Sequence, residues 1–454
     1  MPADRHHRPR WIGLAFFGLT AALLALCLLI GGASRLNGTQ LTILELASLP
    51  LLGWAMWRIT REGLWPTLKA PAVILLGIVL VAVIQLVPLP PGLWSSLPGH
   101  AEPAKALALA GVEIGWRPLT LTPDLTVTHL LALLPATALF LAAVLLRASQ
   151  QAWLMAIIVA FALISLSLGA MQVIDGQDSS LYLYPFVNRD NAVGLFANRN
   201  HQASMMVAAL PLAAAAAAIA RDRRVPPIPL WVALGVVFLV IIPFVVILKS
   251  RAGVLLLVPS LIASLAILWP PRGGLPGVGR NGVLALAAVI VIGMLIGGVF
   301  ALGPVLDRFA EAQEGRLLSG PIAARAAWDL MPLGSGLGSF PDIYAGVEPL
   351  DMIAASPWQQ AHNDYLQLWL EAGVPALIVI LLFLAWWAWA GAGAWRAPTE
   401  SRSILARAGA VAVGLMLIHS FVDYPLRTPA MMAVFAVACA ALATAGRRSR
   451  RSGG

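Results

Sequence analysis

Residues 229–248 read P-L-W-V-A-L-G-V-V-F-L-V-I-I-P-F-V-V-I-L, a stretch without a charged side chain. A run of about 20 apolar residues is long enough to cross the hydrocarbon core of a bilayer, roughly 30 Å thick, as an α-helix. A helix is the expected conformation because a backbone that faces lipid must satisfy its own hydrogen bonds. The stretch therefore predicts a transmembrane helix.

Similar runs recur along the whole 454-residue chain, which is 59% hydrophobic, only 11% charged, and has a mean hydropathy of +0.83. A soluble domain carries about a quarter charged residues, so this class is excluded. We predict an all-α, polytopic membrane bundle of about twelve transmembrane helices. The expected spans are 11–30, 41–57, 70–87, 127–146, 152–173, 200–220, 229–248, 252–269, 282–302, 374–395, 404–421 and 428–446.

Charge along the chain predicts the orientation. With the N-terminus in the cytoplasm, 19 of the 30 Lys and Arg residues but only 4 of the 21 acidic residues fall on the cytoplasmic side. This is a positive-inside pattern, and it places both ends in the cytoplasm. The net charge of +9 then reflects anionic lipid at the inner surface. Nucleic acid is not an expected partner, because no basic stripe is interleaved with aromatic residues.

The N-terminal apolar run is longer than the core of a signal peptide and is followed by many spans, so we expect an uncleaved first helix. Cys27 and Cys439 both fall in apolar spans and are expected to be small core residues. CxxC, HExxH, P-loop and Rossmann patterns are missing from the sequence, as is a visible internal repeat. We expect no cofactor and no metal.

The longest polar stretch begins with D-L-M-P-L-G-S-G-L-G-S-F-P-D at residues 329–342 and ends with Q-Q-A-H-N-D-Y-L-Q-L-W-L-E-A-G-V-P at 359–375. It belongs to the largest predicted outer segment, 303–373. Polar side chains gathered beside a bilayer indicate a site for a lipid-linked or translocated substrate. The residues concerned are Arg325, Asp329, Asp342, His362, Asn363, Asp364 and Glu371.

Three basic residues in the predicted outer segments are candidates for binding an anion. Lys249 and Arg251 break the charge rule, which indicates either snorkelling to lipid head groups or an anion site. Arg325 lies four residues before Asp329, so it forms either a surface ion pair or a phosphate contact through its planar fork of donors. We expect the glycine run 334–338 to form a tight structural turn rather than an anion nest.

His362 is the best single catalytic candidate, because an imidazole can take a proton from a hydroxyl near neutral pH. Asn363 and Asp364 stand beside it and could orient it. His201 and His419 are rivals. His419 and Asp423 are four residues apart, so we expect His419 to be tied to Asp423.

Five segments, in this order, carry a resemblance to a known family. They are F-A-N-R-N-H (196–201), S-R-A-G (250–253), R-A-A-W followed by P-L-G-S-G-L-G-S-F (325–340), A-H-N-D-Y-L-Q-L-W-L-E-A-G (361–373) and H-S-F-V-D-Y-P-L (419–426). Over roughly residues 190–430 the chain resembles the O-antigen ligase and O-antigen polymerase superfamily of bacterial envelope proteins. The first 190 residues match only as membrane helices.

The resemblance implies a metal-free glycosyltransferase with a GT-C-like fold in the bacterial inner membrane and an active site on the periplasmic face. Such enzymes transfer a glycan from undecaprenyl pyrophosphate to an acceptor hydroxyl, in lipopolysaccharide or other polysaccharide biosynthesis. By position, Arg251 and Arg325 would hold the pyrophosphate and His362 would act on the acceptor. The metal-dependent relatives carry an acidic residue in the first outer loop, and residues 31–40 contain none.

Supporting roles are expected for Arg199, His201, Asn363, Asp364, His419 and Asp423. The chain is expected to divide into N-terminal helices (1–190), a ligase-like core (191–430), and a last helix with a basic tail (431–454). The resemblance leaves open whether the enzyme is a ligase or a polymerase. The two differ in acceptor, which is a glycan or lipid for a ligase and a second lipid-linked repeat for a polymerase. A polytopic transporter is the second class, although no two halves of the sequence are related by a visible repeat and ionisable residues at mid-bilayer depth are few.

Overall fold

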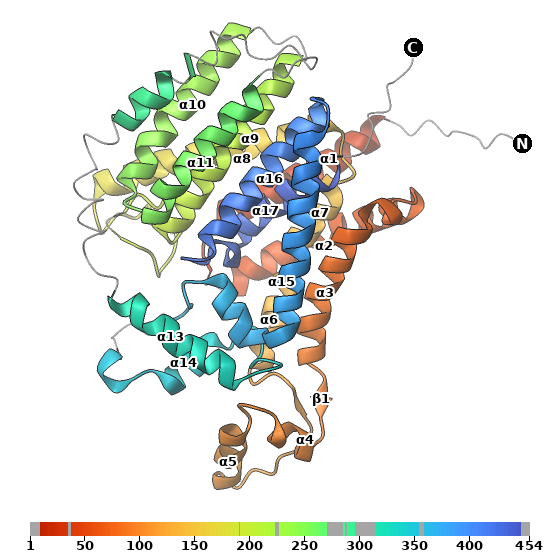
Figure 1. Cartoon of the computed structure of the whole chain (residues 1–454), viewed down its shortest axis with the longest axis vertical. Helices are drawn as coiled ribbons and strands as arrows, with labels where there is room; N and C mark the ends of the chain where they lie inside the picture. The colour runs from red at the N-terminus through yellow and green to blue at the C-terminus, as the bar shows by residue number, and fades with distance from the viewer. Residues whose placement is uncertain are drawn as a thin grey trace, which may run out of the picture.

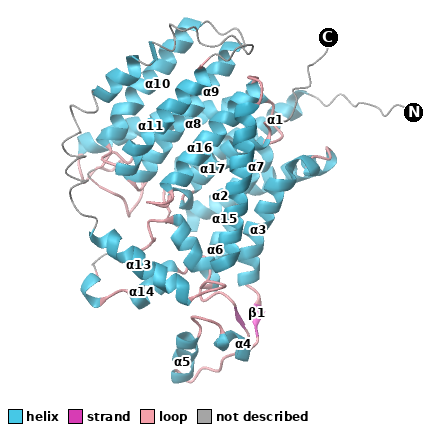
Figure 2. Cartoon of the chain, viewed as in Figure 1, coloured by secondary structure: helices cyan, strands magenta, loops and turns pink. Residues whose placement is uncertain are grey.

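The computed structural model describes residues 10–34, 38–189, 191–222, 227–269, 285–286, 288–295, 314–353 and 358–445. These residues are almost wholly helical. The only strands among them are β1 (Pro88–Leu89) and β2 (Arg117–Pro118), which pair antiparallel (Figure 2). The all-α prediction is confirmed.

Nine helical stretches in the described part of the chain are long and apolar enough to cross a membrane, and each coincides with a predicted span. They are α1 (Arg10–Ile30), α3 (Lys69–Gln85) with η1 (Trp65–Leu68), α6 (Pro123–Leu131) continued by α7 (Leu134–Ala143), α8 (Ala148–Asp175), α9 (Arg199–Asp222), α10 (Pro227–Ile247), α11 (Arg251–Leu268), α15 (Asp364–Arg396) and α16 (Ser401–His419). The chain is therefore a polytopic helical protein.

Three predicted spans stand apart. Span 41–57 lies in α2 (Gly38–Arg61), a helix that includes Glu45 and is not among the nine. Span 428–446 corresponds to α17 (Pro429–Ala443), an apolar helix of 15 residues. Span 282–302 lies mostly outside the described residues, as does the basic tail from residue 446. The count of twelve remains a prediction.

The centre of the bundle is α9, which packs on α8, α10, α11 and α16. Its alanine run 213–218 presents little side-chain bulk, which allows close approach of neighbouring helices. The same effect brings α16 onto α17, where a Cβ on Gly409 would collide with the carbonyl oxygen of Ala438. At the periphery, Ile228, Val232 and Val236 of α10 are exposed at a spacing of four residues, as expected for a face toward lipid. Cys27 and Cys439 are buried and unpaired, as predicted.

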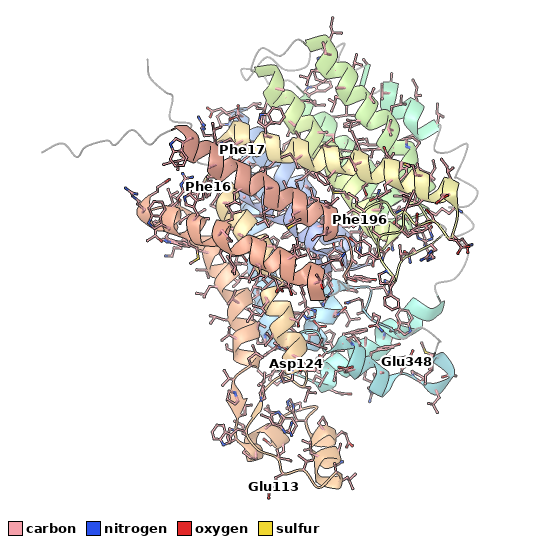
Figure 3. All side chains as sticks on the ribbon, turned by 180° about the vertical axis from the view of Figure 1, so that it is seen from behind. Phe16, Phe17, Glu113, Asp124, Phe196 and Glu348 are labelled. Atoms are coloured by element: carbon pink, nitrogen blue, oxygen red, sulfur yellow. The ribbon has the colours of Figure 1, made fainter. Side chains whose placement is uncertain are left out.

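The helix ends gather in two groups. At one end, Arg402 donates to the carbonyl of Leu146 (3.3 Å) and Gln151 to the hydroxyl of Thr444 (3.3 Å). At the other end, the amide of Ala430 donates to Gly31 (3.0 Å). Phe16 and Phe17 of α1 lie toward the first end, while Glu113, Asp124 and Glu348 lie toward the second (Figure 3).

The second end carries the extramembrane structure. Helices α13 (Glu314–Asp329) and α14 (Phe340–Val347) lie beneath the bundle, and α4 (Pro91–Ser96) and α5 (Ala101–Leu109) project beyond them (Figure 1). α13 and α14 share a small apolar core with the start of α15, built around Ala327, Tyr344 and Leu370. This core fixes the polar stretch 329–375 to the mouth of the bundle.

Candidate functional site

The candidate site forms where the start of α15 meets the turn between α16 and α17. His362 lies just before α15, and its ring nitrogen Nδ1 forms a hydrogen bond with Oδ1 of Asp423 at 3.2 Å. Asp423 lies in the turn that joins α16 to η3 (Pro425–Arg427). The two residues are 61 positions apart in the sequence and meet only in the fold.

Local backbone geometry explains why the His362 ring faces this turn. The side chain of Asn363 caps α15 by accepting from the amides of Tyr365 and Leu366, both at 3.0 Å. The cap marks the start of the helix, and His362, just before it, adopts a φ of +50°, in the left-handed region. This conformation costs about 1–2 kcal/mol for a residue other than glycine, and such costs concentrate at functional sites. The sequence prediction that Asn363 orients His362 is thus given a mechanism, through the helix cap.

Aromatic rings enclose the His362 imidazole. Its centroid lies 4.9 Å from that of Tyr424 and 5.8 Å from that of Trp358, both in edge-on packing. Tyr424 also packs edge-on against His201 of α9 at 4.9 Å, which brings a second histidine beside the first. The side chain of His362 remains 21% exposed, whereas His201 and His419 are 1% and 0% exposed. Of the three candidates, His362 alone is open to a substrate.

His419 does not have the hydrogen bond that we expected. Its Nδ1 pairs with the hydroxyl of Ser204 on α9, while Asp423 turns toward α15. The reason is that the helix ends at His419, so the next four residues reverse direction and the amide of Asp423 returns to the carbonyl of His419 (3.0 Å). Spacing of four residues therefore gives a backbone contact here rather than a side-chain pair.

Asp423 is fully buried and remains a carboxylate. Burial alone would raise its pKa, but the hydrogen bond from His362 and the charges of the neighbouring imidazoles outweigh burial and lower the pKa below its ordinary value. An ionised carboxylate at Nδ1 favours the tautomer of His362 that carries its proton there. Nε2 is then left free to accept a proton.

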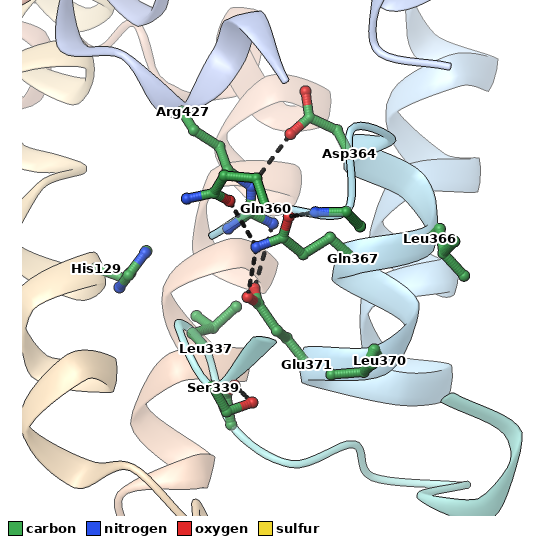
Figure 4. Close-up of polar contacts among 12 residues, drawn as sticks. His129, Leu337, Ser339, Gln360, Asp364, Leu366, Gln367, Leu370, Glu371 and Arg427 are labelled. Carbon is green, nitrogen blue, oxygen red and sulfur yellow. Dashed lines mark hydrogen bonds and ion pairs between the residues drawn. The ribbon is translucent and has the colours of Figure 1, made fainter. Parts of the chain in front are cut away.

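A second polar group, near the start of α15, consists of Arg427, Asp364, Glu371 and Gln367, and Figure 4 shows its contacts. Arg427 donates from Nε to Asp364 Oδ1 and from Nη2 to Glu371 Oε2, both at 3.2 Å. Gln367 donates to Glu371 Oε1 at 2.9 Å. Burial would lower the pKa of Arg427, but the two carboxylates outweigh it and raise the pKa above its ordinary value. The arginine is held by the protein's own anions.

The glycine run forms a structural turn, as predicted. The amides of Ser335 and Gly336 donate to the carbonyls of Leu370 (3.1 Å) and Glu371 (2.8 Å), and the amide of Leu337 donates to Gln85 (3.0 Å). Gly334, Gly336 and Gly338 all have positive φ. These amides are used within the protein, so the run is not an anion nest.

The predicted basic residues lie at the same end of the molecule but in different surroundings. Arg251 is the first residue of α11, and Ser250 caps this helix. Gly253 packs against Ala203, which brings the start of α11, and with it Arg251, beside the first turn of α9. Arg199 donates to Asn191 at 3.0 Å. Arg325 is exposed on α13, and its guanidinium has no hydrogen bond or ion pair within the described residues, including Asp329. Of the two alternatives for Arg325, the surface pair with Asp329 is therefore not formed within the described residues.

Sequence reasoning missed Arg427, Glu371 as its partner, and Tyr424. Arg427 carried a usable signal, because it is a cation at a predicted outer boundary and breaks the charge rule as Arg251 does. Its partners are 56 and 63 residues away, so no spacing pointed to them.

Residues 236–381 match the family model described as O-antigen ligase. This segment, about a third of the chain, is similar to O-antigen ligases. This supports the superfamily that the five sequence segments indicated, and with it a membrane protein of polysaccharide biosynthesis. No curated protein matches the chain.

The matched segment contains Arg251, Arg325 and His362, whereas Asp423 and Arg427 lie beyond its end. The candidate site therefore combines residues from inside the matched segment with residues that follow it. No group of three or more His, Cys, Asp or Glu side chains in the described ranges is arranged to hold a metal.

Proposed function

We propose that this protein is a membrane glycosyltransferase that transfers a glycan from undecaprenyl pyrophosphate to an acceptor hydroxyl on the periplasmic side of the bacterial inner membrane. The observation that carries the proposal is the pair of His362, inside the segment that matches O-antigen ligases, with a buried, ionised Asp423 at the mouth of the helical bundle. A GT-C-like arrangement, with a core over 191–430, is part of the proposal.

His362 is the general base. Its Nε2 removes the proton of the acceptor hydroxyl as the oxygen attacks the anomeric carbon, while Asp423 stabilises the imidazolium that forms. The bond between that carbon and the pyrophosphate oxygen breaks, and the pyrophosphate departs with the bonding electrons.

Arg251 and Arg325 bind the pyrophosphate in this proposal. Fixed or recruited guanidinium groups stabilise the developing negative charge, and their forked donors match phosphate oxygens. Because the donor brings its own leaving group, the reaction needs no nucleotide. We also propose that it needs no metal, since the cations of the protein neutralise the leaving group.

The acceptor decides between two enzymes that share this chemistry. A ligase transfers the glycan to lipid A-core or another carrier, and a polymerase to a second lipid-linked repeat. The proposal favours the ligase reaction, with the polymerase reaction as the alternative for the same site.

The test is a transfer assay with purified protein in detergent or nanodiscs. Glycan-loaded undecaprenyl pyrophosphate is supplied with a hydroxyl acceptor in EDTA and without nucleotide, and the product is followed by gel shift. Transfer is expected, and it should persist in EDTA. Failure to transfer to lipid A-core or to a lipid-linked repeat, together with solute uptake into liposomes, would overturn the proposal in favour of a transporter.

A further inference from the structure

We propose that Arg427 and Asp364 form a clamp that positions His362 against Asp423. The clamp deepens the proposed function, on which its catalytic consequence rests. Both are positioning residues, since neither contacts the His362 ring.

The contacts tie together the two chain segments that carry the reacting pair. Asp364 follows His362 by two residues, and its amide donates to the carbonyl of Ser420 at 2.9 Å. Its carboxylate accepts from the Ser420 hydroxyl at 2.8 Å and from Arg427 Nε at 3.2 Å. Ser420 and Arg427 flank Asp423 on either side in the sequence. A single carboxylate thus holds both sides of the Asp423 turn to the His362 end of α15.

The backbone of His362 explains why such a clamp is needed. A positive φ at a histidine is unfavourable, and it persists only where the surroundings fix both neighbours. Asn363 fixes the helical side through its cap, and Asp364 fixes the distance to the Asp423 turn. Without the second constraint, the turn and the helix start could separate, and the 3.2 Å contact of His362 with Asp423 would be lost.

Charge and burial show that Arg427 is a structural cation and not a third pyrophosphate ligand. Its side chain is 12% exposed, and it faces Asp364 and Glu371, which are 8% and 0% exposed. All four oxygens of these two carboxylates accept a hydrogen bond, from Arg427, Ser420 or Gln367. Two buried carboxylates already compete for one guanidinium, so a further anion would be repelled.

The primary test variant is Asp364→Asn. It removes the charge partner of Arg427 on the His362 side, and it leaves Arg427 and Glu371 as a balanced pair, so the fold is expected to persist. We expect the turnover number to fall by about 10- to 100-fold through misplacement of the base, with the KM for the donor little changed. In a His362→Ala background the same substitution should cause no further loss, because there is no base left to position.

Glu371→Gln is the matched control. It also removes a charge partner of Arg427, but it lies two helical turns farther along α15, and it should keep most of the activity. Equal losses in Glu371→Gln and Asp364→Asn, or a loss that adds to that of His362→Ala, would show a general role in stability and overturn the proposal.

Hydrogen exchange separates the clamp from the proposed chemistry. The Asp364 amide should exchange faster in Asp364→Asn than in wild type or Glu371→Gln, whether or not the protein transfers glycan. Arg427→Lys, which keeps the charge but loses the fork, provides a second variant with the same expected pattern if Asp364→Asn does not fold. Unchanged exchange in a folded variant contradicts the clamp, whereas absent transfer in wild type contradicts only the proposed function.

Discussion

His362 and Arg325, which we propose to act in one reaction, lie in opposite kinds of surroundings. His362 is enclosed by two aromatic rings, hydrogen-bonded to a buried carboxylate, and held in a strained backbone conformation. Arg325 stands exposed on α13 and has no polar partner among the described residues. The fold fixes the surroundings of the His362 ring, whereas it leaves the Arg325 side chain exposed.

The difference follows from what each group must do. A general base works only in one tautomer and at hydrogen-bond distance from its hydroxyl, so its orientation must exist before the acceptor arrives. A phosphate-binding guanidinium gains most of its energy from the ligand itself, and an exposed side chain costs little to keep. Substitutions at the two sites should therefore separate activity from stability in different ways.

The largest effect is expected for His362→Ala, with a loss of about 10²- to 10⁴-fold in the transfer rate because the base is gone. Binding of the lipid pyrophosphate should survive. The measurement is initial rate together with donor binding. His100→Ala is the control, because His100 is a buried histidine of the α4–α5 projection whose ring pairs with Pro98 and Leu119. Wild-type turnover in His362→Ala would make His362 structural.

Arg325→Ala should come next, with a loss of about 10²- to 10³-fold through removal of charge stabilisation. Its unfolding free energy should stay within about 0.5 kcal/mol of wild type, because the side chain is exposed and unpaired within the described structure. Arg325→Lys should recover only part of the rate. The measurement is rate against thermal unfolding, with Asp329→Asn as the neighbouring control. Full activity in Arg325→Ala would remove Arg325 from the site. Arg251→Ala should show a comparable loss of rate.

Asp423→Asn should affect both the transfer rate and the stability. The rate should fall by about 10-fold or more, because the His362 tautomer is no longer fixed. Because the pKa of Asp423 is lowered in the folded state, its ionisation stabilises the protein above the ordinary aspartate value of about 3.9. This stabilisation is lost as the pH falls through the lowered folded pKa. Wild type should therefore lose more stability than Asp423→Asn below about pH 4, as measured by melting temperature in detergent. Parallel pH curves would contradict this assignment.

The least perturbing experiment tests whether His362 and Arg325 face the same compartment. Reporter fusions at Gly111 and Glu348 should give periplasmic signals, and a fusion at Thr399 a cytoplasmic one. Gly111 follows α5 and Glu348 follows α14 at the extramembrane end (Figure 1), while Thr399 accepts from Arg407 (3.2 Å) at the opposite end. A cytoplasmic signal at Glu348 would place the candidate site on the wrong side of the membrane.

The helices and their alternating direction could be read from the sequence, because length, apolarity and the placement of arginines are local properties. His362 could also be singled out as a candidate from the sequence, since few histidines stand beside polar residues at a predicted membrane boundary. The pairings were not. Asp423 was predicted to contact His419, and only the turn after α16 sends its side chain to His362 instead. Arg427 was overlooked because its partners lie on another helix. Long-range pairs depend on tertiary packing, which spacing does not encode.

The break in α15 at Gly373 has a mechanical consequence. Residues 364–372 form the helical turns next to His362, whereas Val374 onward enters the apolar span, and Gly373 between them has non-helical dihedral angles (φ +53°, ψ −140°). The amide of Val374 donates to the carbonyl of Pro332, just before the glycine run (2.8 Å), which anchors the break to the outer layer. Transmembrane helices tilt when the bilayer thins or thickens. If α15 tilts, the break at Gly373 lets the apolar span from Val374 onward move while residues 364–372 keep their position. The His362–Asp423 pair is therefore insulated from changes in membrane thickness.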